Sequence, residues 1–241
     1  VSRALAREGI AVLRFDFAGI GASAGDFAAT TFSSNVDDLV AAADHLRGLG
    51  QAPALLIGHS LGGAAVLAAA ARIPEATAVA TIAAPADVAH VEHNFADAVA
   101  TIEADGAAQV KLGGGKLFTV TRELLDDVRD QPQAERIGKL RRALLVMHSP
   151  TDATVGIENA TAIFLAAMHP KSFVSLDGAD HFLTRPADAD YAARVISGWA
   201  DRYLPPAPAP EAPETGVIAV AETGADFTAR LAVPAADRAL G

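Results

Sequence analysis

Short apolar stretches recur along the chain and predict buried β-strands. Four of the five are almost continuously apolar, without the alternation of polar residues that marks a strand with one solvated face. This pattern is typical of parallel strands covered by helices on both faces, because neither row of side chains meets water. The five predicted strands are Ile10–Phe17, Ala54–Ile57, Ala78–Ala84, Arg142–His148 and Lys171–Leu176.

Helical patterns separate these strands. Ser2–Glu8 predicts a helix that stops at Gly9, and Asn35–Leu49 places apolar residues on one helical face. The alanine-rich segment Leu61–Arg72 predicts another helix directly after the second strand. This alternation predicts an α/β fold with a doubly wound, mostly parallel sheet.

One segment, about Asp87–Ile137, does not fit the alternation. It contains a helix-like stretch over Val88–Ala104, a predicted hairpin around Gly113–Gly115, and a second helix from about Arg122. Thr121 is the predicted N-cap of that second helix. An insertion at the carboxyl edge of a parallel sheet is where a lid over an active site would lie, and a solvated helical decoration is the equal alternative.

Composition and charge limit the partners and the cellular location that we expect for the protein. The 241 residues carry a formal net charge of −10, which argues against nucleic acid or an anionic membrane as the main partner. The uncharged stretch Gly48–Ala71 divides into strand, turn and helix and is a poor transmembrane segment. The chain has no cysteine, so disulfides and thiolate metal sites are excluded, and we expect a cytoplasmic protein.

The most informative motif is Gly58-His59-Ser60-Leu61-Gly62-Gly63, between the second strand and its helix. G-x-S-x-G in this context predicts a nucleophile elbow, in which a strained turn exposes Ser60. We expect Gly58 and Gly62 to prevent side chains from colliding across the turn. The backbone N–H of Leu61, at a helix N-terminus, is the predicted oxyanion donor.

A serine nucleophile requires a base and an acid that orients the base. Asp152 follows the fourth predicted strand and His181 follows the fifth, so both lie at the same sheet edge as Ser60. The chain order serine, acid, histidine is that of hydrolases with this elbow. We predict that Ser60 attacks an acyl carbon, His181 transfers the proton, and Asp152 orients the imidazole.

Other residues compete for these roles. Asp180, the neighbour of His181, and Asp87 are alternative acids, whereas Asp16 is better interpreted as fixing its own loop. His59 is interpreted as a packing or loop-bonding histidine rather than a second base, and His148 as structural.

Two further patterns are weaker. His90 and His93 have a spacing compatible with a metal, but no third ligand is apparent, so solvated lid residues are favoured. Gly19-Ile20-Gly21 has the glycines of a dinucleotide loop without the right helix spacing. No metal or cofactor is predicted.

Further motifs accompany the elbow along the chain. They are Arg14–Phe17, Thr30–Asn35, His148-Ser149-Pro150 and Lys171-Ser172-Phe173. Together with the elbow they resemble the α/β-hydrolase superfamily and, more closely, bacterial proteins that fuse such a hydrolase to an OsmC-type domain. The similarity covers about Ser2–Leu204. It implies an α/β-hydrolase fold with a lid over residues 87–137 and a serine esterase-type activity.

The same resemblance accounts for the C-terminal residues. Residues 205–214 form a proline- and alanine-rich linker, and residues 215–241 resemble the truncated start of an OsmC-type domain, with a hairpin formed by Val217–Gly224 and Phe227–Val233. The peroxide chemistry of OsmC relatives uses cysteines that this chain lacks.

The resemblance also implies missing N-terminal strands. The superfamily's third strand would lie between Ile10–Phe17 and Ala54–Ile57 in the sheet. That strand, and the loop with the second oxyanion donor, would precede Val1. We therefore expect this chain to be poorly active or unstable.

Three functions remain open. The first is a serine hydrolase of carboxylic esters or thioesters, with a small acyl substrate and no nucleic acid or membrane partner. The second is a serine aminopeptidase-like hydrolase, for which Glu92, Asp97 or Glu103 could bind a peptide terminus. The third is a non-catalytic hydrolase-fold module that positions an OsmC-type domain.

Overall fold

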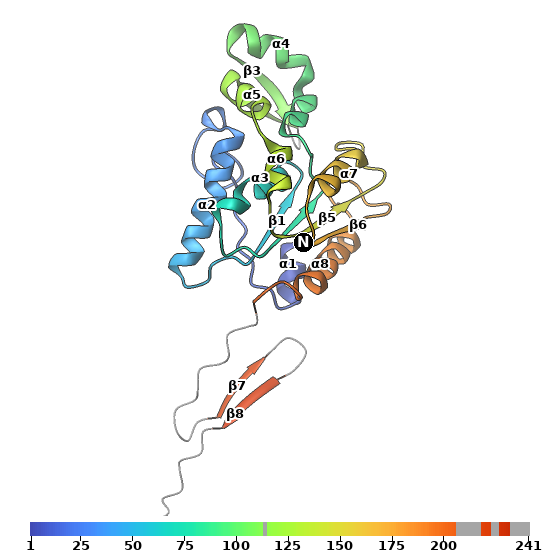
Figure 1. Ribbon diagram of the computed structural model, residues 1–241. Coiled ribbons are helices and arrows are strands. Elements are labelled where there is room, and N and C mark those ends of the chain that lie inside the picture. The colour runs from blue at the N-terminus through green and yellow to red at the C-terminus, as the bar shows by residue number, and fades with distance from the viewer. Residues whose placement is uncertain (113–114, 206–217, 223–226, 232–241) are drawn as a thin grey trace, which may run out of the picture.

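Four parallel strands form the central sheet of the protein (Figure 1). The structure is a computed structural model that describes residues 1–112, 115–205, 218–222 and 227–231. In spatial order the strands are β1 (Leu55–His59), β2 (Ala78–Ile82), β5 (Ala143–His148) and β6 (Lys171–Ser175), and every adjacent pair is parallel. The predicted parallel α/β sheet is thus confirmed for four of its five strands.

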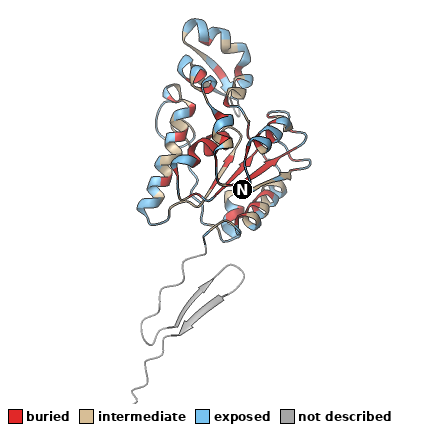
Figure 2. Cartoon of the chain, in the orientation of Figure 1, coloured by how far each residue is buried: buried red, intermediate tan, exposed pale blue. Residues whose placement is uncertain are grey.

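Helices cover both faces of this sheet, which explains the continuous apolar strands. In β5, Leu144 and Val146 pack into one hydrophobic cluster, whereas Leu145 and Met147 pack into another on the opposite face. The two central strands, β2 and β5, are buried throughout, and Figure 2 shows the covering helices with exposed outer faces. The first face carries α2 (Phe32–Gly48), α3 (Leu61–Ala69), α6 (Gln133–Gly138) and α7 (Ile157–Ala166), and the second carries α1 (Ser2–Arg7) and α8 (Pro186–Ala200).

Local capping sets the helix ends. Helix α2 begins at Phe32, three residues before the predicted start at Asn35, because Thr31 and Ser34 form a capping box. The Thr31 hydroxyl accepts from the Ser34 N–H at 3.1 Å, and the Ser34 hydroxyl accepts from the Thr31 N–H at 2.9 Å. Helix α3 continues into the 3-10 turn η2 (Ala70–Arg72). No helix within the described ranges is long and apolar enough to cross a membrane.

The prediction of a strand over Ile10–Phe17 is wrong. These residues form no strand, and within the described residues none of their backbone groups pairs with another strand. Val12, Leu13 and Phe15 are exposed. A strand needs a hydrogen-bonding neighbour as well as an apolar sequence, and β1 is the edge of the described sheet. The apolar composition alone therefore misleads here. The segment leads into the 3-10 turn η1 (Phe27–Ala29).

Residues 87–137 form a helical and hairpin segment between β2 and β5, here named the cap. The predicted hairpin is present as β3 and β4, although residues 113–114 at its tip lie outside the described residues. Thr121 caps α5, as predicted, by accepting from the Leu124 N–H at 3.4 Å. The elements are η3 (Val88–Phe95), α4 (Ala96–Asp105), β3 (Ala107–Leu112), β4 (Lys116–Thr121), α5 (Arg122–Arg129) and α6.

The predicted single helix over Val88–Ala104 is divided in two. Phe95 has φ −144° and ψ 32°, outside the helical region, and separates the 3-10 helix η3 from α4. The sequence pattern predicts a helical stretch here but does not reveal the backbone break at Phe95.

Near the C-terminus, β7 (Ile218–Glu222) and β8 (Phe227–Leu231) pair antiparallel, as the predicted hairpin requires. Apart from Pro205, the predicted linker over residues 205–214 lies outside the described residues, as do the other residues of the 215–241 segment. The OsmC-type assignment stays a prediction.

The turn between β1 and α3 has the close packing expected of an elbow. Ser60 has φ 53° and ψ −129°, a strained conformation for a residue with a side chain, and its N–H donates to the Ile82 carbonyl at 2.9 Å. A Cβ atom added to Gly58 would lie 2.2 Å from the Gly62 carbonyl oxygen, and one added to Gly63 would lie 2.6 Å from the Ala84 Cβ. At Gly62 nothing lies within 4 Å. The steric prediction therefore holds for Gly58 and is wrong for Gly62, and Gly63 is the second crowded position.

Substitutions at these glycines test the packing of the elbow. We expect Gly58→Ala to reduce the free energy of unfolding by about 1–3 kcal/mol, because the added methyl overlaps backbone atoms of α3. We expect the matched Gly62→Ala to be neutral or to stabilise by up to about 1 kcal/mol, because it adds a methyl to an open position on a helix. Urea denaturation measures both, and equal losses would contradict the packing described here.

Candidate active site

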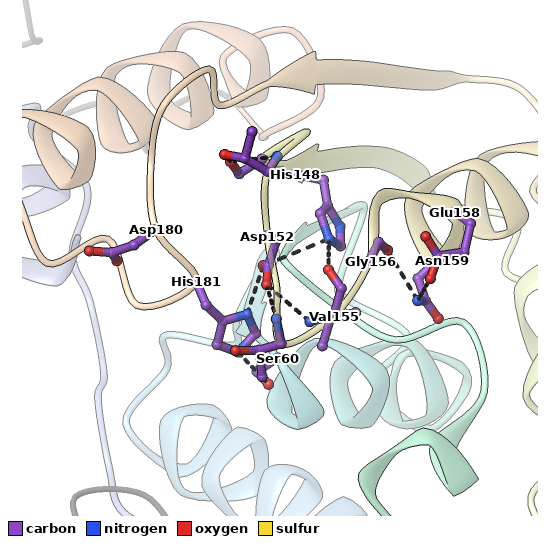
Figure 3. Close-up of polar contacts among 12 residues, drawn as sticks. Ser60, His148, Asp152, Val155, Gly156, Glu158, Asn159, Asp180 and His181 are labelled. Atoms are coloured by element: carbon purple, nitrogen blue, oxygen red, sulfur yellow. Dashed lines mark hydrogen bonds and ion pairs between the residues drawn. The ribbon is translucent and has the colours of Figure 1, made fainter. Parts of the chain in front are cut away.

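Three loops at the carboxyl ends of the strands bring the predicted catalytic side chains together (Figure 3). Ser60 follows β1, Asp152 lies between β5 and α7, and His181 lies between β6 and α8. Parallel strands end at a common edge, so residues far apart in the sequence meet there. The structure thus places all three residues at one site, as their positions after predicted strands led us to expect.

The three side chains form a continuous hydrogen-bonded row. His181 Nε2 lies 3.0 Å from Ser60 Oγ, and His181 Nδ1 lies 2.7 Å from Asp152 Oδ2. Because a carboxylate accepts, the row assigns the imidazole proton to Nδ1 and leaves Nε2 to accept from the Ser60 hydroxyl. Asp152 and His181 are both buried. This arrangement can move a proton from Ser60 to the imidazole while a carboxylate stabilises the cation that forms.

The loop backbone holds Asp152 as an anion. Asp152 Oδ1 accepts from the N–H groups of Thr154 at 2.8 Å and Val155 at 3.0 Å. Burial by itself raises the pKa of this carboxyl. The hydrogen bonds from Val155, His181 and Thr154 outweigh burial and lower the pKa below its ordinary value. The second oxygen is therefore free to orient His181.

The sequence pattern does not predict these two backbone donors, Thr154 and Val155. Their signal is the turn-forming run Ser149-Pro150-Thr151-Asp152, in which an aspartate accepts from the N–H two residues later.

The Leu61 N–H lies beside Ser60 at the start of the nine-residue helix α3. Among the residues that the structure describes, this N–H has no hydrogen-bond acceptor. An unpaired N–H at a helix N-terminus is suited to an oxyanion, so the predicted donor role of Leu61 stays a prediction with compatible geometry.

The carboxylates of the alternative acids accept hydrogen bonds from backbone N–H groups near them in the sequence. Asp180 is exposed, and its carboxylate accepts from Thr184 and Phe182 N–H groups of its own loop. The Thr184 hydrogen bond is the main cause that lowers the pKa of Asp180. Asp87 caps η3 through the Ala89 N–H at 3.1 Å. Asp16 accepts from the Ala22 N–H at 3.0 Å, as its predicted loop-fixing role requires.

Three other histidines bond loops around Ser60, Asp152 and His181. His59 Nε2 donates to the His181 carbonyl at 2.6 Å, which confirms its predicted loop-bonding role. The buried His148 donates through Nε2 to the Val155 carbonyl at 2.8 Å and thereby stabilises the loop of Asp152. His90, from the cap, donates to the Thr154 carbonyl of the same loop at 3.1 Å.

His90 lies edge-on to His93, with ring centroids 4.7 Å apart. Within the described residues, no group of three or more acidic, histidine or cysteine side chains has a geometry that could hold a metal ion.

The burial of His59 makes folding stability sensitive to pH. Desolvation lowers the pKa of His59, and its hydrogen bond to His181 opposes this only in part. As pH falls through about 6.5, the unfolded chain binds a proton before the folded protein does, so the free energy of unfolding falls. The slope for one such group reaches about 1.4 kcal/mol per pH unit.

We therefore expect the wild type to lose more stability between pH 7.5 and 5.5 than His59→Gln, which cannot titrate. Chemical denaturation across this range measures both slopes. Parallel pH profiles would contradict the partly buried, neutral state of His59.

Comparison with known proteins agrees with the α/β fold. The profile of the family described as serine aminopeptidase, S33, matches residues 1–123, which include the elbow but neither Asp152 nor His181. The esterase domain of a Rhodothermus marinus protein is 48% identical, with a TM-score of 0.67 over 84% of this chain and 78% of that one. No curated protein sequence matches this chain.

Two more distant structures share the fold. Est1E from Butyrivibrio proteoclasticus, with ferulic acid bound, is 17% identical, with a TM-score of 0.66 over 84% of this chain and 80% of that one. A monoacylglycerol lipase from Paleococcus ferrophilus is 19% identical, with a TM-score of 0.63 over 83% and 87% of the two chains. The parallel sheet, the family profile and the 48% identical esterase domain together show that this chain belongs to the serine aminopeptidase S33 family of α/β hydrolases.

Proposed function

We propose that the protein is a serine hydrolase that cleaves carboxylic ester or thioester bonds through an acyl-enzyme. The observation that carries the proposal is the unbroken row from Asp152 through His181 to Ser60, with contacts of 2.7 and 3.0 Å. A strained serine beside a buried, charge-stabilised histidine is the arrangement that activates a hydroxyl nucleophile. The similarity to a Rhodothermus marinus esterase domain supports the same reaction class.

The proposed mechanism has two stages. In the first, Ser60 Oγ attacks the acyl carbon as its proton passes to His181 Nε2, and the developing oxyanion accepts from the Leu61 N–H. His181 then gives that proton to the departing alcohol or thiol, which leaves an acyl group on Ser60. In the second stage, water attacks the acyl carbon, His181 takes a proton from the water, and Ser60 regains its proton as the acid departs.

Contacts within the cap favour an esterase over an aminopeptidase. A peptide amino terminus would need an unpaired carboxylate to bind it. Glu92 and Glu103, two of the three candidates, are both paired with Arg129, at 2.8 and 2.7 Å. The third, Asp97, is on the exposed surface of α4. We propose that the cap acts as a lid, because His90 joins it to the loop that holds Asp152.

The proposed roles predict how far each substitution lowers the hydrolysis of p-nitrophenyl acetate. We expect Ser60→Ala to lower kcat by roughly 10³-fold or more, because the nucleophile is lost. We expect Asp152→Asn to lower it by a comparable factor, because the amide no longer fixes the Nδ1–H tautomer of His181. The matched control is Asp87→Asn, which changes the alternative acid but keeps its N-cap oxygen, and it should stay within about threefold of wild type.

The same assay distinguishes the competing functions. Alanine p-nitroanilide should be cleaved far more slowly than the ester, and its preferred cleavage would favour the aminopeptidase alternative. Ester turnover that persists in Ser60→Ala, or a large loss in Asp87→Asn with Asp152→Asn active, would contradict the assigned roles.

A further inference from the structure

The loop that carries His181 is braced by its own hydrogen bonds, and two of its apolar residues, Ala179 and Leu183, pack in the hydrophobic cluster beneath it. Asp180 Oδ1 accepts from the N–H groups of Phe182 at 3.0 Å and Thr184 at 2.9 Å, which fixes the shape of residues 177–184. Arg185 donates to the Gly178 carbonyl at 3.0 Å. These bonds stay within the loop and its immediate continuation. They therefore cannot by themselves set the distance between His181 and Ser60.

One hydrogen bond joins this loop backbone to the sheet. His59 Nε2 donates to the His181 carbonyl oxygen at 2.6 Å. In the described part of the chain, no other hydrogen bond connects the backbone of residues 177–184 to a residue outside the 175–188 region. The other described hydrogen bonds that join residues 177–184 to residues outside the 175–188 region come from the His181 side chain, to Asp152 and Ser60.

The position of His59 makes it a direct connection between nucleophile and base. It is the last residue of β1, and its side chain lies on the sheet face of Leu55 and Ile57, four and two residues earlier. The next residue is Ser60, whose N–H is bound to the end of β2. The His59 ring also lies 4.9 Å from the His181 ring and 6.2 Å from the Phe182 ring.

From this geometry we infer that His59 is a positioning residue: its Nε2–H holds the His181 backbone against the elbow and so sets the Ser60 Oγ to His181 Nε2 distance. The inference rests on the proposed function. Without this bond, the loop is held by the apolar packing of Ala179 and Leu183, which is non-directional, and by the His181 ring nitrogens, so the His181 backbone can shift relative to the elbow. Displacement of a reacting group by about 1 Å can cost roughly 100-fold in rate, so the effect belongs to kcat.

Three variants separate the hydrogen bond from packing. His59→Ala removes ring and donor, His59→Phe keeps an aromatic ring without a donor, and His59→Gln keeps a side-chain N–H at similar reach. For p-nitrophenyl acetate we expect kcat to fall roughly 10- to 100-fold in the Ala and Phe variants, with KM within about threefold of wild type. We expect His59→Gln to recover kcat to within about fivefold.

The rate of fluorophosphonate labelling of Ser60 should follow kcat across the three variants, because it too requires His181 to activate the serine. Thermal unfolding identifies any variant that fails to fold. If His59→Ala fails to fold, the kcat values of His59→Phe and His59→Gln decide whether the hydrogen bond positions His181.

Two outcomes would overturn the inference alone: an active wild type with His59→Ala and His59→Phe within twofold of it, or a His59→Gln variant as slow as His59→Phe. A wild-type chain that hydrolyses no acyl ester and takes up no fluorophosphonate would overturn the proposed function, and the role of His59 with it.

Discussion

The strained backbone of Ser60 is the constraint on which the site depends. A side chain at φ 53° persists only where its surroundings over-determine it, and three contacts do so here. The Ser60 N–H is bound to the end of β2, and Gly58 and Gly63 allow α3 to approach β1 and the residues after β2. The same turn carries the Ser60 hydroxyl, the Leu61 N–H and the His59 imidazole. A single local conformation therefore places the proposed nucleophile, the proposed oxyanion donor and the hydrogen bond to the His181 backbone.

The charge of Asp152 and the hydrogen bonds to its loop complete the site that the Ser60 turn organises. The buried Asp152 keeps its charge because two backbone amides bind one of its oxygens, while the other orients His181. His148 and His90 each donate to a carbonyl of the same loop, at Val155 and Thr154. These bonds position Asp152 and, through it, His181, and His148 Nε2 also lies 3.8 Å from Asp152 Oδ2. The cap is in this way coupled to the catalytic geometry through His90.

Sequence reasoning succeeded where chemistry and chain position coincide. Ser60, Asp152 and His181 could be found because each follows a predicted parallel strand, and such strands end at one edge. It failed where the outcome depends on distant partners. Ile10–Phe17 is apolar enough for a strand but has no described neighbour to pair with. The choice between Gly62 and Gly63 depends on contact with Ala84, and the bond from His59 to His181 joins residues 122 positions apart.

The central claim is that Ser60 is a nucleophile activated by His181, and covalent labelling tests it most directly. The wild-type protein would be treated with a fluorophosphonate and its peptides sequenced by mass spectrometry. The account predicts a single adduct on Ser60, which disappears in Ser60→Ala and forms much more slowly in His181→Ala. A folded protein that takes up no label, or that is labelled at another residue while Ser60 stays unmodified, would contradict it.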